Sequence, residues 1–290
     1  MLAVSTKRGN NAAMTMRRLA ALPRPLAFVL PGGGALGSYQ VGVLSALTAA
    51  AITPDLLIGV SAGAVNAALF AWNGGPLGIA HIEDVWRNLK RRDLLRVHPG
   101  RLALALAGHR PSFVDNRHGE RFLRRHLGDR QIQDAPTRLA VIATDLTSGR
   151  AVALTRGDAA NAVLASSAFP GVYAPVRHDG VMFVDGGVVA DIPLDAAVEL
   201  GARSALIISV PALAATQPPR KALDILFRAS TFGVEAHGRT MLRRPPPELE
   251  VVEIPAPPSP ITTFAVGRSA VAIEEAFYAT SVWLTTVENR

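Results

Sequence analysis

Short apolar segments alternate with helix-like segments through most of this 290-residue chain. The strand-like segments are 26–30, 56–60, 139–146, 151–155, 181–187 and 205–210. The helix-like segments are about 39–50, 65–72, 159–168 and 191–202. Strands that are apolar on both faces and separated by helices are typical of a mostly parallel sheet covered by helices on both sides. The sequence therefore predicts an α/β fold, a three-layer α/β/α architecture with a mostly parallel central sheet.

The chain is expected to form one domain behind a short leader. Residues 1–25 are basic, and the apolar run LAFVL that follows them runs directly into a proline and three glycines. This run is too short for the apolar core of a signal peptide. We therefore expect a disordered leader over 1–25 and a single domain over 26–290.

The core motifs of this domain fall in 26–210, and a C-terminal helical region is expected over 220–290. Proline-rich stretches at 211–221 and 244–260 predict loops. A stripe of apolar residues predicts a last helix from about Thr262 to Val287.

The segment 56–80 carries no charged residue over a length that could span a bilayer. Its five glycines, two asparagines and one proline disfavour a membrane-spanning helix. A buried strand, turn and helix account for it better. We expect the chain to be located in the cytoplasm, where it can contact the membrane peripherally.

Positive charge is concentrated between residues 87 and 130. This stretch holds twelve Lys and Arg residues against four Asp and Glu, an excess larger than the net charge of +7 of the whole chain. Such a stretch is typical either of a solvated helical insertion or of a surface that docks on anionic lipid head groups, and both interpretations stay open. The chain has no cysteine, which excludes disulfides, thiolate metal ligands and a cysteine nucleophile.

A glycine-rich loop follows the first predicted strand. Gly32, Gly34 and Gly37 have the G-x-G-x-x-G spacing of loops that bind dinucleotide phosphates. A dinucleotide site would need an acidic residue after the second strand, whereas Asp55 precedes that strand. A P-loop would need a lysine after Gly37, where the chain has Ser38. The loop is therefore better suited to present backbone amides to another negative charge.

The second predicted strand leads into a candidate nucleophile. The run IGVSAGA places Gly59, Ser61 and Gly63 in the pattern G-x-S-x-G, between a strand and a helix. A sharp strand-to-helix turn crowds the backbone, so glycines flank a serine whose hydroxyl is exposed at the edge of the sheet. The N-terminus of the helix behind it favours developing negative charge. Ser61 is therefore the predicted nucleophile.

A serine nucleophile needs a base and donors for the oxyanion. An α/β-hydrolase triad runs Ser, Asp or Glu, then His along the chain, and Ser61, Asp145 or Asp185, and His237 satisfy this order. His237, however, lies in a helix-like run and not in a loop after a strand. A surface position on a helix is its simpler interpretation, and the Ser-Asp-His triad stays as the alternative.

Asp185 in the run FVDGGVVADIP is a second candidate base. It ends an apolar strand, and Gly186 and Gly187 leave space around its carboxylate. A free aspartate, with a pKa near ~3.9, is a poor base. It could act only where a partly desolvated site holds it against the serine hydroxyl and raises its basicity. A plain Asp-Gly-Gly turn is the competing interpretation.

Five motifs in sequence resemble the patatin-like phospholipase family: GGGALGSYQVGVL, GVSAG, ATDLTSGRAV, LASSAFPGVYAPV and FVDGGVVADIPL. The resemblance implies a patatin-like fold, with the basic stretch as a helical insertion, and lipid acyl hydrolysis by a Ser-Asp dyad without histidine, cofactor or metal. It assigns Ser61 as the nucleophile and Asp185 as the base. It gives the amides of Gly32, Gly33 and Gly34 the role of the oxyanion hole.

The resemblance implies a phospholipase A or esterase type of reaction through an acyl-enzyme. The implied partners are a lipid or ester substrate and an anionic membrane surface, and no nucleic acid. A catalytically weak, lipid-binding member of the family would show the same motifs and stays as a further alternative.

The chain departs from the family pattern at two positions. Leu36 stands where many members carry a cation that helps the oxyanion. Asp191 stands where the family often has asparagine, two residues before Pro193. We interpret Asp191 as a helix cap and Asp145 as a structural residue.

Overall fold

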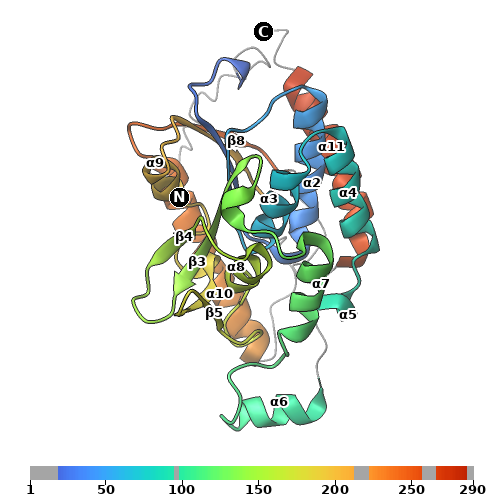
Figure 1. Ribbon diagram of the computed structural model, residues 1–290, viewed down its shortest axis with the longest axis vertical. Helices are drawn as coiled ribbons and strands as arrows, with labels where there is room; N and C mark the ends of the chain where they lie inside the picture. Colours follow the sequence, from blue (N-terminus) through green and yellow to red (C-terminus); the bar gives the residue numbers. More distant parts are fainter. Residues whose placement is uncertain (1–18, 95–97, 212–221, 257–265, 286–290) are drawn as a thin grey trace, which may run out of the picture.

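The computed structural model describes residues 19–94, 98–211, 222–256 and 266–285. An eight-stranded sheet runs through its centre, with helices on both faces (Figure 1). The strands are β1 (Leu26–Leu30), β2 (Leu56–Val60), β3 (Arg138–Asp145), β4 (Ala151–Leu154), β5 (Val176–His178), β6 (Val181–Asp185), β7 (Ser204–Ile208) and β8 (Glu250–Ile254). The helices are α2 (Gly37–Ala49), α3 (Ala62–Trp72), α4 (Pro76–Asn88), α5 (Arg91–Leu94), α6 (Pro99–Leu106), α7 (Arg117–Leu127), α8 (Ala159–Ser166), α9 (Leu194–Glu199), α10 (Ala222–Arg243) and α11 (Ser269–Thr285).

The sheet has the order β5-β6-β3-β2-β1-β7-β8, and β4 pairs with β3 beside this path. Strands β3, β2, β1, β7 and β8 are parallel neighbours. The pairs β3-β4, β3-β6 and β5-β6 are antiparallel. Short turns join β3 to β4 and β5 to β6, and short turns can connect only antiparallel strands. The expected α/β fold with a mostly parallel sheet is confirmed.

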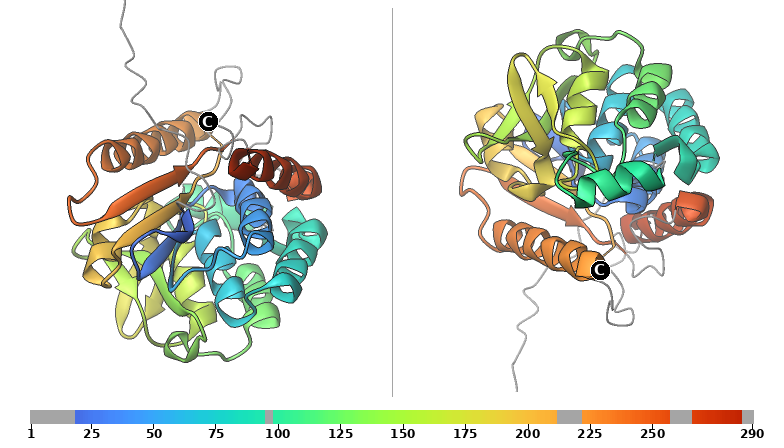
Figure 2. Two further views of the ribbon diagram at one scale, coloured as in Figure 1. Left: turned by 90° about the horizontal axis from the view of Figure 1, so that it is seen from above. Right: turned by 90° about the horizontal axis from the view of Figure 1, so that it is seen from below.

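The two faces of the sheet belong to two separate cores. In β1, Phe28 and Leu30 pack into the core beneath α2, α3, α4, α7, α8 and α11. Ala27 and Val29 point the other way, into the core beneath α9 and α10. Successive side chains of a strand face opposite sides, so a strand between two helix layers must be apolar throughout. Figure 2 shows the two layers on either side of the sheet.

Part of the expected leader packs against the domain. Leu19 and Leu22, which fall inside the leader expected over 1–25, are buried against the larger core. Apolar side chains in a basic segment were the overlooked signal, because burying two leucines stabilises the segment on the body of the domain. Residues 1–18 lie outside the described part of the chain.

Strand β8 corrects the loop expected over 244–260. Its alternate residues Val252 and Ile254 are buried, and the whole strand pairs in parallel with β7 at the edge of the sheet. The prolines around this strand pointed to a loop, but they stand outside the five residues that pair. The C-terminal region is therefore not helical throughout.

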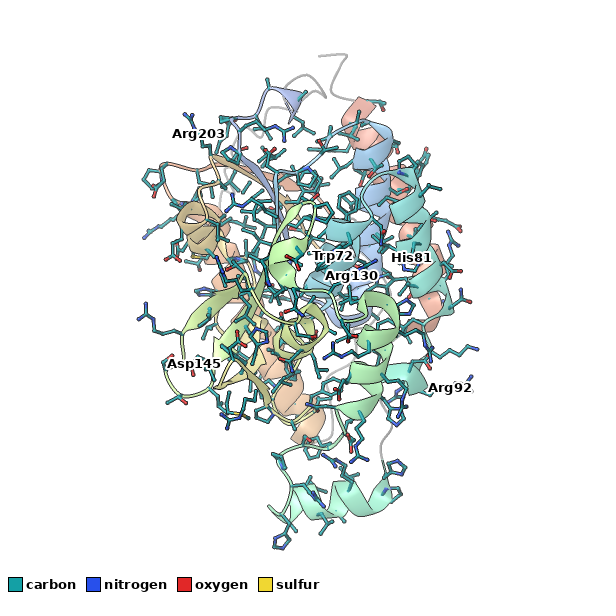
Figure 3. All side chains as sticks on the ribbon, viewed as in Figure 1. Trp72, His81, Arg92, Arg130, Asp145 and Arg203 are labelled. Atoms are coloured by element: carbon teal, nitrogen blue, oxygen red, sulfur yellow. The ribbon has the colours of Figure 1, made fainter. Side chains whose placement is uncertain are left out.

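The uncharged segment 56–80 forms β2, α3 and the start of α4. Across the described residues, no helix combines the length and the apolar character that crossing a bilayer requires. The basic stretch 87–130 contains the helices α5, α6 and α7, as expected for a helical insertion. One of its cations, exposed Arg130, contacts an aromatic ring of α3: its guanidinium lies 5.5 Å from the centre of the Trp72 ring (Figure 3).

Candidate active site

Ser61 occupies the sharp turn between β2 and α3. Its φ of 53° and ψ of −119° lie in a region that residues with a side chain rarely adopt. The flanking glycines make the turn sterically feasible. A Cβ at Gly63 would lie 2.0 Å from the Leu30 carbonyl oxygen, and a Cβ at Gly59 would lie 2.5 Å from Ala64 Cα. This is the strained strand-turn-helix geometry that the G-x-S-x-G pattern predicted.

The register of the sheet brings Asp185 to the same level as the serine. Val60, the last residue of β2, pairs with Ile142 of β3. Ser61 follows Val60, and Asp185 pairs with Ala143, the residue that follows Ile142. Strand β6 runs antiparallel to β3. Asp185, the last residue of β6, therefore lies beside the residue of β3 that is level with Ser61.

The two side chains are in direct contact. Ser61 Oγ donates a hydrogen bond of 2.7 Å to Asp185 Oδ2. The second carboxylate oxygen, Oδ1, accepts a hydrogen bond of 2.9 Å from the Gly187 amide. Thr144 Oγ1 donates to the Asp185 carbonyl oxygen at 2.9 Å and holds the end of β6 in place. Each oxygen of the carboxylate thus accepts a hydrogen bond, one from the serine hydroxyl and the other from a backbone amide.

Burial raises the pKa of Asp185 to about 6, whereas the hydrogen bonds from Ser61 and Gly187 act in the opposite direction. The carboxylate is therefore a stronger base than a solvated aspartate and is still mainly ionised at neutral pH. Both properties are needed in a group that takes a proton from an alcohol.

Ser166 holds the backbone of the nucleophile. The Ser61 amide donates a hydrogen bond of 2.8 Å to Ser166 Oγ, which in turn donates to the Ile142 carbonyl oxygen at 2.6 Å. Ser166 is fully buried at the end of α8. This serine belongs to the motif LASSAFPGVYAPV, but sequence reasoning gave it no role, because its partners lie 105 and 24 residues away.

The glycine loop lies against Ser61. A Cβ at Gly32 would be 3.3 Å from Ser61 Cβ. The Gly32 amide already donates a hydrogen bond of 2.9 Å to Asp191 Oδ1. In the described part of the chain, the amides of Gly33 and Gly34 have no hydrogen-bond acceptor. The loop therefore has two amides without an acceptor, those of Gly33 and Gly34, and a third that is engaged by a carboxylate.

Asp191 is not the helix cap that the sequence suggested. Helix α9 begins three residues later, its N-cap is Pro193, and no side chain caps it. The carboxylate instead binds the Gly32 amide. Burial raises the pKa of Asp191 to about 7, the hydrogen bond from Gly32 lowers it, and the negative charges of Asp185 and Glu235 raise it further. Two carboxylates therefore share the site.

A buried network of polar side chains from α2, α3 and α4 holds the backbone of the glycine loop in place. Gln40 Nε2 donates to the Pro31 carbonyl oxygen at 2.8 Å, and Asn66 Nδ2 donates to the Gly37 carbonyl oxygen at 2.8 Å. Asn66 Nδ2 also donates to Gln40 Oε1, and Trp86 Nε1 donates to Asn66 Oδ1. A satisfied buried network of this kind makes the loop rigid. The sequence analysis missed it, since its members come from α2, α3 and α4.

The other residues considered from sequence form no side-chain hydrogen bond with Ser61 or Asp185 in the described part of the chain. Leu36 is buried in the larger core, and His237 is an exposed residue of α10. Asp145 accepts hydrogen bonds within the turn after β3 (Figure 3), and Asp55 forms an ion pair with Arg24 at 2.8 Å. In the described ranges, no group of three or more His, Asp or Glu side chains could hold a metal ion.

Comparison with known proteins identifies the family of the chain. The family model described as Patatin-like phospholipase matches residues 28–198. Lysophospholipase NTE1 of Phaeosphaeria nodorum is 28% identical over 190 residues, which are 66% of this chain and 12% of that protein. An uncharacterized NTE family protein of Mycobacterium tuberculosis is 32% identical over 171 residues, 58% of this chain and 44% of that protein.

Among solved structures, VipD from Legionella pneumophila is similar with a TM-score of 0.45 and 15% identity, over 91% of this chain and 67% of that one. The chain spans less than half of the length of the fungal and the mycobacterial relative. The matched family segment covers more than half of the chain and includes Ser61 and Asp185. The chain belongs to the patatin-like phospholipase family.

Proposed function

We propose that this protein is a serine lipid acyl hydrolase, of phospholipase A or esterase type, that cleaves carboxylic esters of membrane lipids. The observation that carries the proposal is the hydrogen bond of 2.7 Å from Ser61 Oγ to Asp185 Oδ2. Family membership supports the substrate class, because patatin-like phospholipases act on lipid esters.

In the first step, Asp185 takes the proton of the Ser61 hydroxyl as Oγ attacks the ester carbonyl carbon. Negative charge develops on the carbonyl oxygen, next to the amides of Gly33 and Gly34. The carbon-oxygen bond to the leaving alcohol then breaks, and the alcohol leaves with the proton held by Asp185. The products of this step are an acyl-enzyme on Ser61 and a lysolipid or other alcohol.

In the second step, water completes hydrolysis. Asp185 takes a proton from a water molecule, and the resulting hydroxide attacks the acyl-enzyme carbonyl carbon. The same loop amides face the second oxyanion. Ser61 Oγ leaves and recovers the proton from Asp185, which releases a carboxylic acid and restores the dyad.

A fluorophosphonate probe tests the nucleophile, because it reacts covalently with activated serines. Wild type should be labelled and Ser61→Ala should not. Equal labelling of the two proteins would contradict the assignment. Asp185→Asn should fold and lose about 10²- to 10⁴-fold in hydrolysis rate, the usual contribution of a general base.

Two alternatives give different results in the same assay. If a Ser-Asp-His triad operates, His237→Ala is the inactive variant and Asp145 or Asp185 the third member. The exposed position of His237 on α10 does not favour it. If the protein only binds lipid, wild type hydrolyses no ester and Ser61→Ala keeps its biological effect.

Peripheral contact with an anionic membrane is part of the proposal. Helix α6 extends from the body of the domain (Figure 1), and none of its residues is fully buried. It exposes 43% of Leu104 and 63% of Leu106 inside the basic insertion. Apolar side chains beside cations are suited to an anionic lipid surface. Leu104→Ser/Leu106→Ser should weaken binding to anionic vesicles, and binding unaffected by salt would contradict the electrostatic part.

A further inference from the structure

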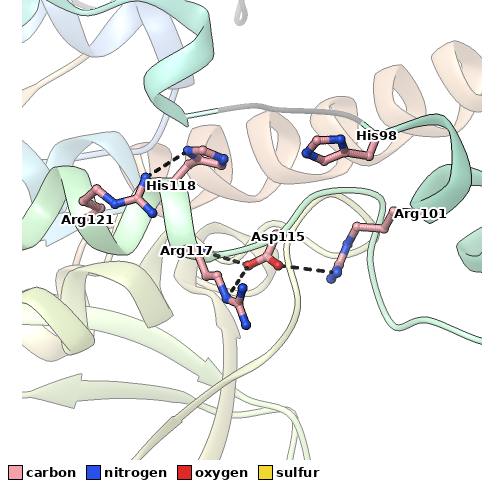
Figure 4. Close-up of a pocket in the computed structure, with 6 residues that line it drawn as sticks. All are labelled: His98, Arg101, Asp115, Arg117, His118 and Arg121. Carbon is pink, nitrogen blue, oxygen red and sulfur yellow. Dashed lines mark hydrogen bonds and ion pairs between the residues drawn. The ribbon is translucent and has the colours of Figure 1, made fainter.

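A basic pocket of about 530 Å³ lies between α6 and the start of α7, and neither member of the dyad lines it (Figure 4). The residues that line it are His98, Arg101, Asp115, Arg117, His118 and Arg121. Three guanidinium groups thus face a pocket that contains one carboxylate. The proposed hydrolysis leaves this cluster without a role.

Asp115 of the pocket lies in a loop that is fixed to the body of the domain. The Phe113 amide donates to the Gly171 carbonyl oxygen at 2.8 Å, and the Val114 amide donates to the Val172 carbonyl oxygen at 2.9 Å. Asn116 forms two side-chain hydrogen bonds with the backbone of the same segment. This loop connects α6 to α7, so its hydrogen bonds to the body of the domain also fix the position of the pocket residues that flank it on these two helices.

Arg101 is the anchored cation of the pocket. Its side chain is only 21% exposed, one Nη donates to Ser112 Oγ at 3.2 Å, and the other lies 3.6 Å from Asp115 Oδ2 (Figure 4). Within the described chain, its buried Nε has no hydrogen-bond partner. A guanidinium held in this way keeps one orientation and has donor capacity to spare.

The other two arginines come from α7. Arg117 and Arg121 are four residues apart and therefore lie on one face of the helix. Asp115 is largely engaged, since its Oδ1 accepts a hydrogen bond of 2.9 Å from the Arg117 amide and its Oδ2 faces Arg101. Arg121 Nη1 lies 3.5 Å from His118 Nδ1 (Figure 4). The pocket therefore keeps an excess of two positive charges after its own carboxylate is counted.

We infer that this pocket is a binding site for a phosphate group, carried either by free inorganic phosphate or by the monoester head group of a lipid such as phosphatidic acid. A phosphate monoester supplies close to two negative charges and three acceptor oxygens, which match the charge excess and the forked donors of several arginines. The site goes beyond the proposed hydrolysis and does not depend on it.

Matched double variants separate this site from the general basic charge of the insertion. Arg117→Gln/Arg121→Gln removes two cations of the pocket, and Arg91→Gln/Arg92→Gln removes two exposed cations of α5 outside it (Figure 3). Calorimetric titration with inorganic phosphate should show binding to wild type that weakens at least about tenfold in the first variant. The second variant should stay within about twofold of wild type. Two calorimetric results would overturn the inference if the two variants also bind vesicles equally. One is an equal loss of phosphate binding in both variants, and the other is no phosphate binding by wild type.

Vesicles identify the source of the phosphate. Phosphatidylcholine vesicles containing phosphatidic acid, a monoester, are compared with vesicles containing phosphatidylglycerol, a diester of like sign. A preference for phosphatidic acid that only the pocket variant loses assigns the site to a lipid head group. Phosphate binding lost only in the pocket variant, with equal vesicle binding of both variants, assigns it to free phosphate.

Asp115→Asn gives a result that misfolding cannot imitate. Loss of the one carboxylate in the pocket should tighten the binding of inorganic phosphate several-fold, and unchanged or weaker binding would count against the site. Hydrolysis of a soluble ester, p-nitrophenyl butyrate, by wild type is measured separately. A wild-type protein without this activity refutes the proposed function and leaves the phosphate result standing.

Discussion

Replacing Asp185 with asparagine should make the stability of the fold less dependent on pH while it lowers the hydrolysis rate about 10²- to 10⁴-fold. The pKa of Asp185 rises from 3.8 to about 6 because the carboxylate is buried. At about 1.4 kcal/mol per pH unit, keeping this group ionised in the fold costs about 3 kcal/mol. The folded chain therefore binds this proton more tightly than the unfolded chain, and this contribution to stability is lost as pH rises from about 4 through about 6.

The variant carries a neutral side chain at every pH. Below about pH 4 the protonated Asp185 of wild type is neutral as well, and each side chain then presents one carbonyl oxygen to the donors of Ser61 and Gly187. Above about pH 7 the ionised carboxylate accepts both hydrogen bonds, and their effect is already contained in its pKa. Asp185→Asn should therefore match wild type in stability below about pH 4 and be more stable by about 3 kcal/mol above about pH 7.

Urea unfolding of both proteins at a series of pH values measures this separation of their stabilities directly, because other titrating groups are common to both and cancel in the difference. Ser61→Ala serves as a second variant. It removes a hydrogen bond that lowers the pKa of Asp185, so its loss of stability should extend to higher pH than in wild type. A difference between wild type and Asp185→Asn that stays constant with pH would refute the reasoning.

Other substitutions test the surroundings of the dyad. Wild-type hydrolysis should rise with pH through about 6. Asp191→Asn should leave this rise in place, because the raised pKa of Asp191, about 7, keeps its carboxyl mostly uncharged while Asp185 ionises; a rise displaced by a full pH unit would contradict this. Ser166→Ala should lower the free energy of unfolding by about 1 to 3 kcal/mol in urea, since the nucleophile's amide loses its acceptor. Gly63→Ala should yield no folded protein by circular dichroism, because the added Cβ would lie 2.0 Å from a backbone oxygen. Gly74→Ala should fold normally, because its added Cβ would lie 3.6 Å from the nearest atom.

The local parts of the site were predictable from sequence. A strand, a G-x-S-x-G turn and a helix are encoded within a few adjacent residues, so the position of Ser61 follows from local rules. The contact with Asp185 was expected only from the order of the family motifs. Its cause lies in the register between β3 and β6, which depends on pairing between distant segments.

The parts that escaped prediction depend on partners far apart in the chain. Asp191 reads as a helix cap when only its neighbours are considered, yet it binds Gly32, which is 159 residues away. Ser166, Gln40 and Asn66 are small or polar residues without a distinctive local pattern, and their roles come from packing between helices. In the same way, β8 is recognisable only through β7, because five residues between prolines carry little information of their own.

The antiparallel course of β6 has a consequence for biosynthesis. Ser61 and Asp185 are separated by 124 residues, so the nucleophile leaves the ribosome long before its base. A shift of β6 by one residue would turn the Asp185 side chain to the opposite face of the sheet. The contact between Ser61 and Asp185 therefore forms only when the central strands are complete and correctly aligned. A growing or misaligned chain lacks it, so the proposed activity would depend on completion of the sheet.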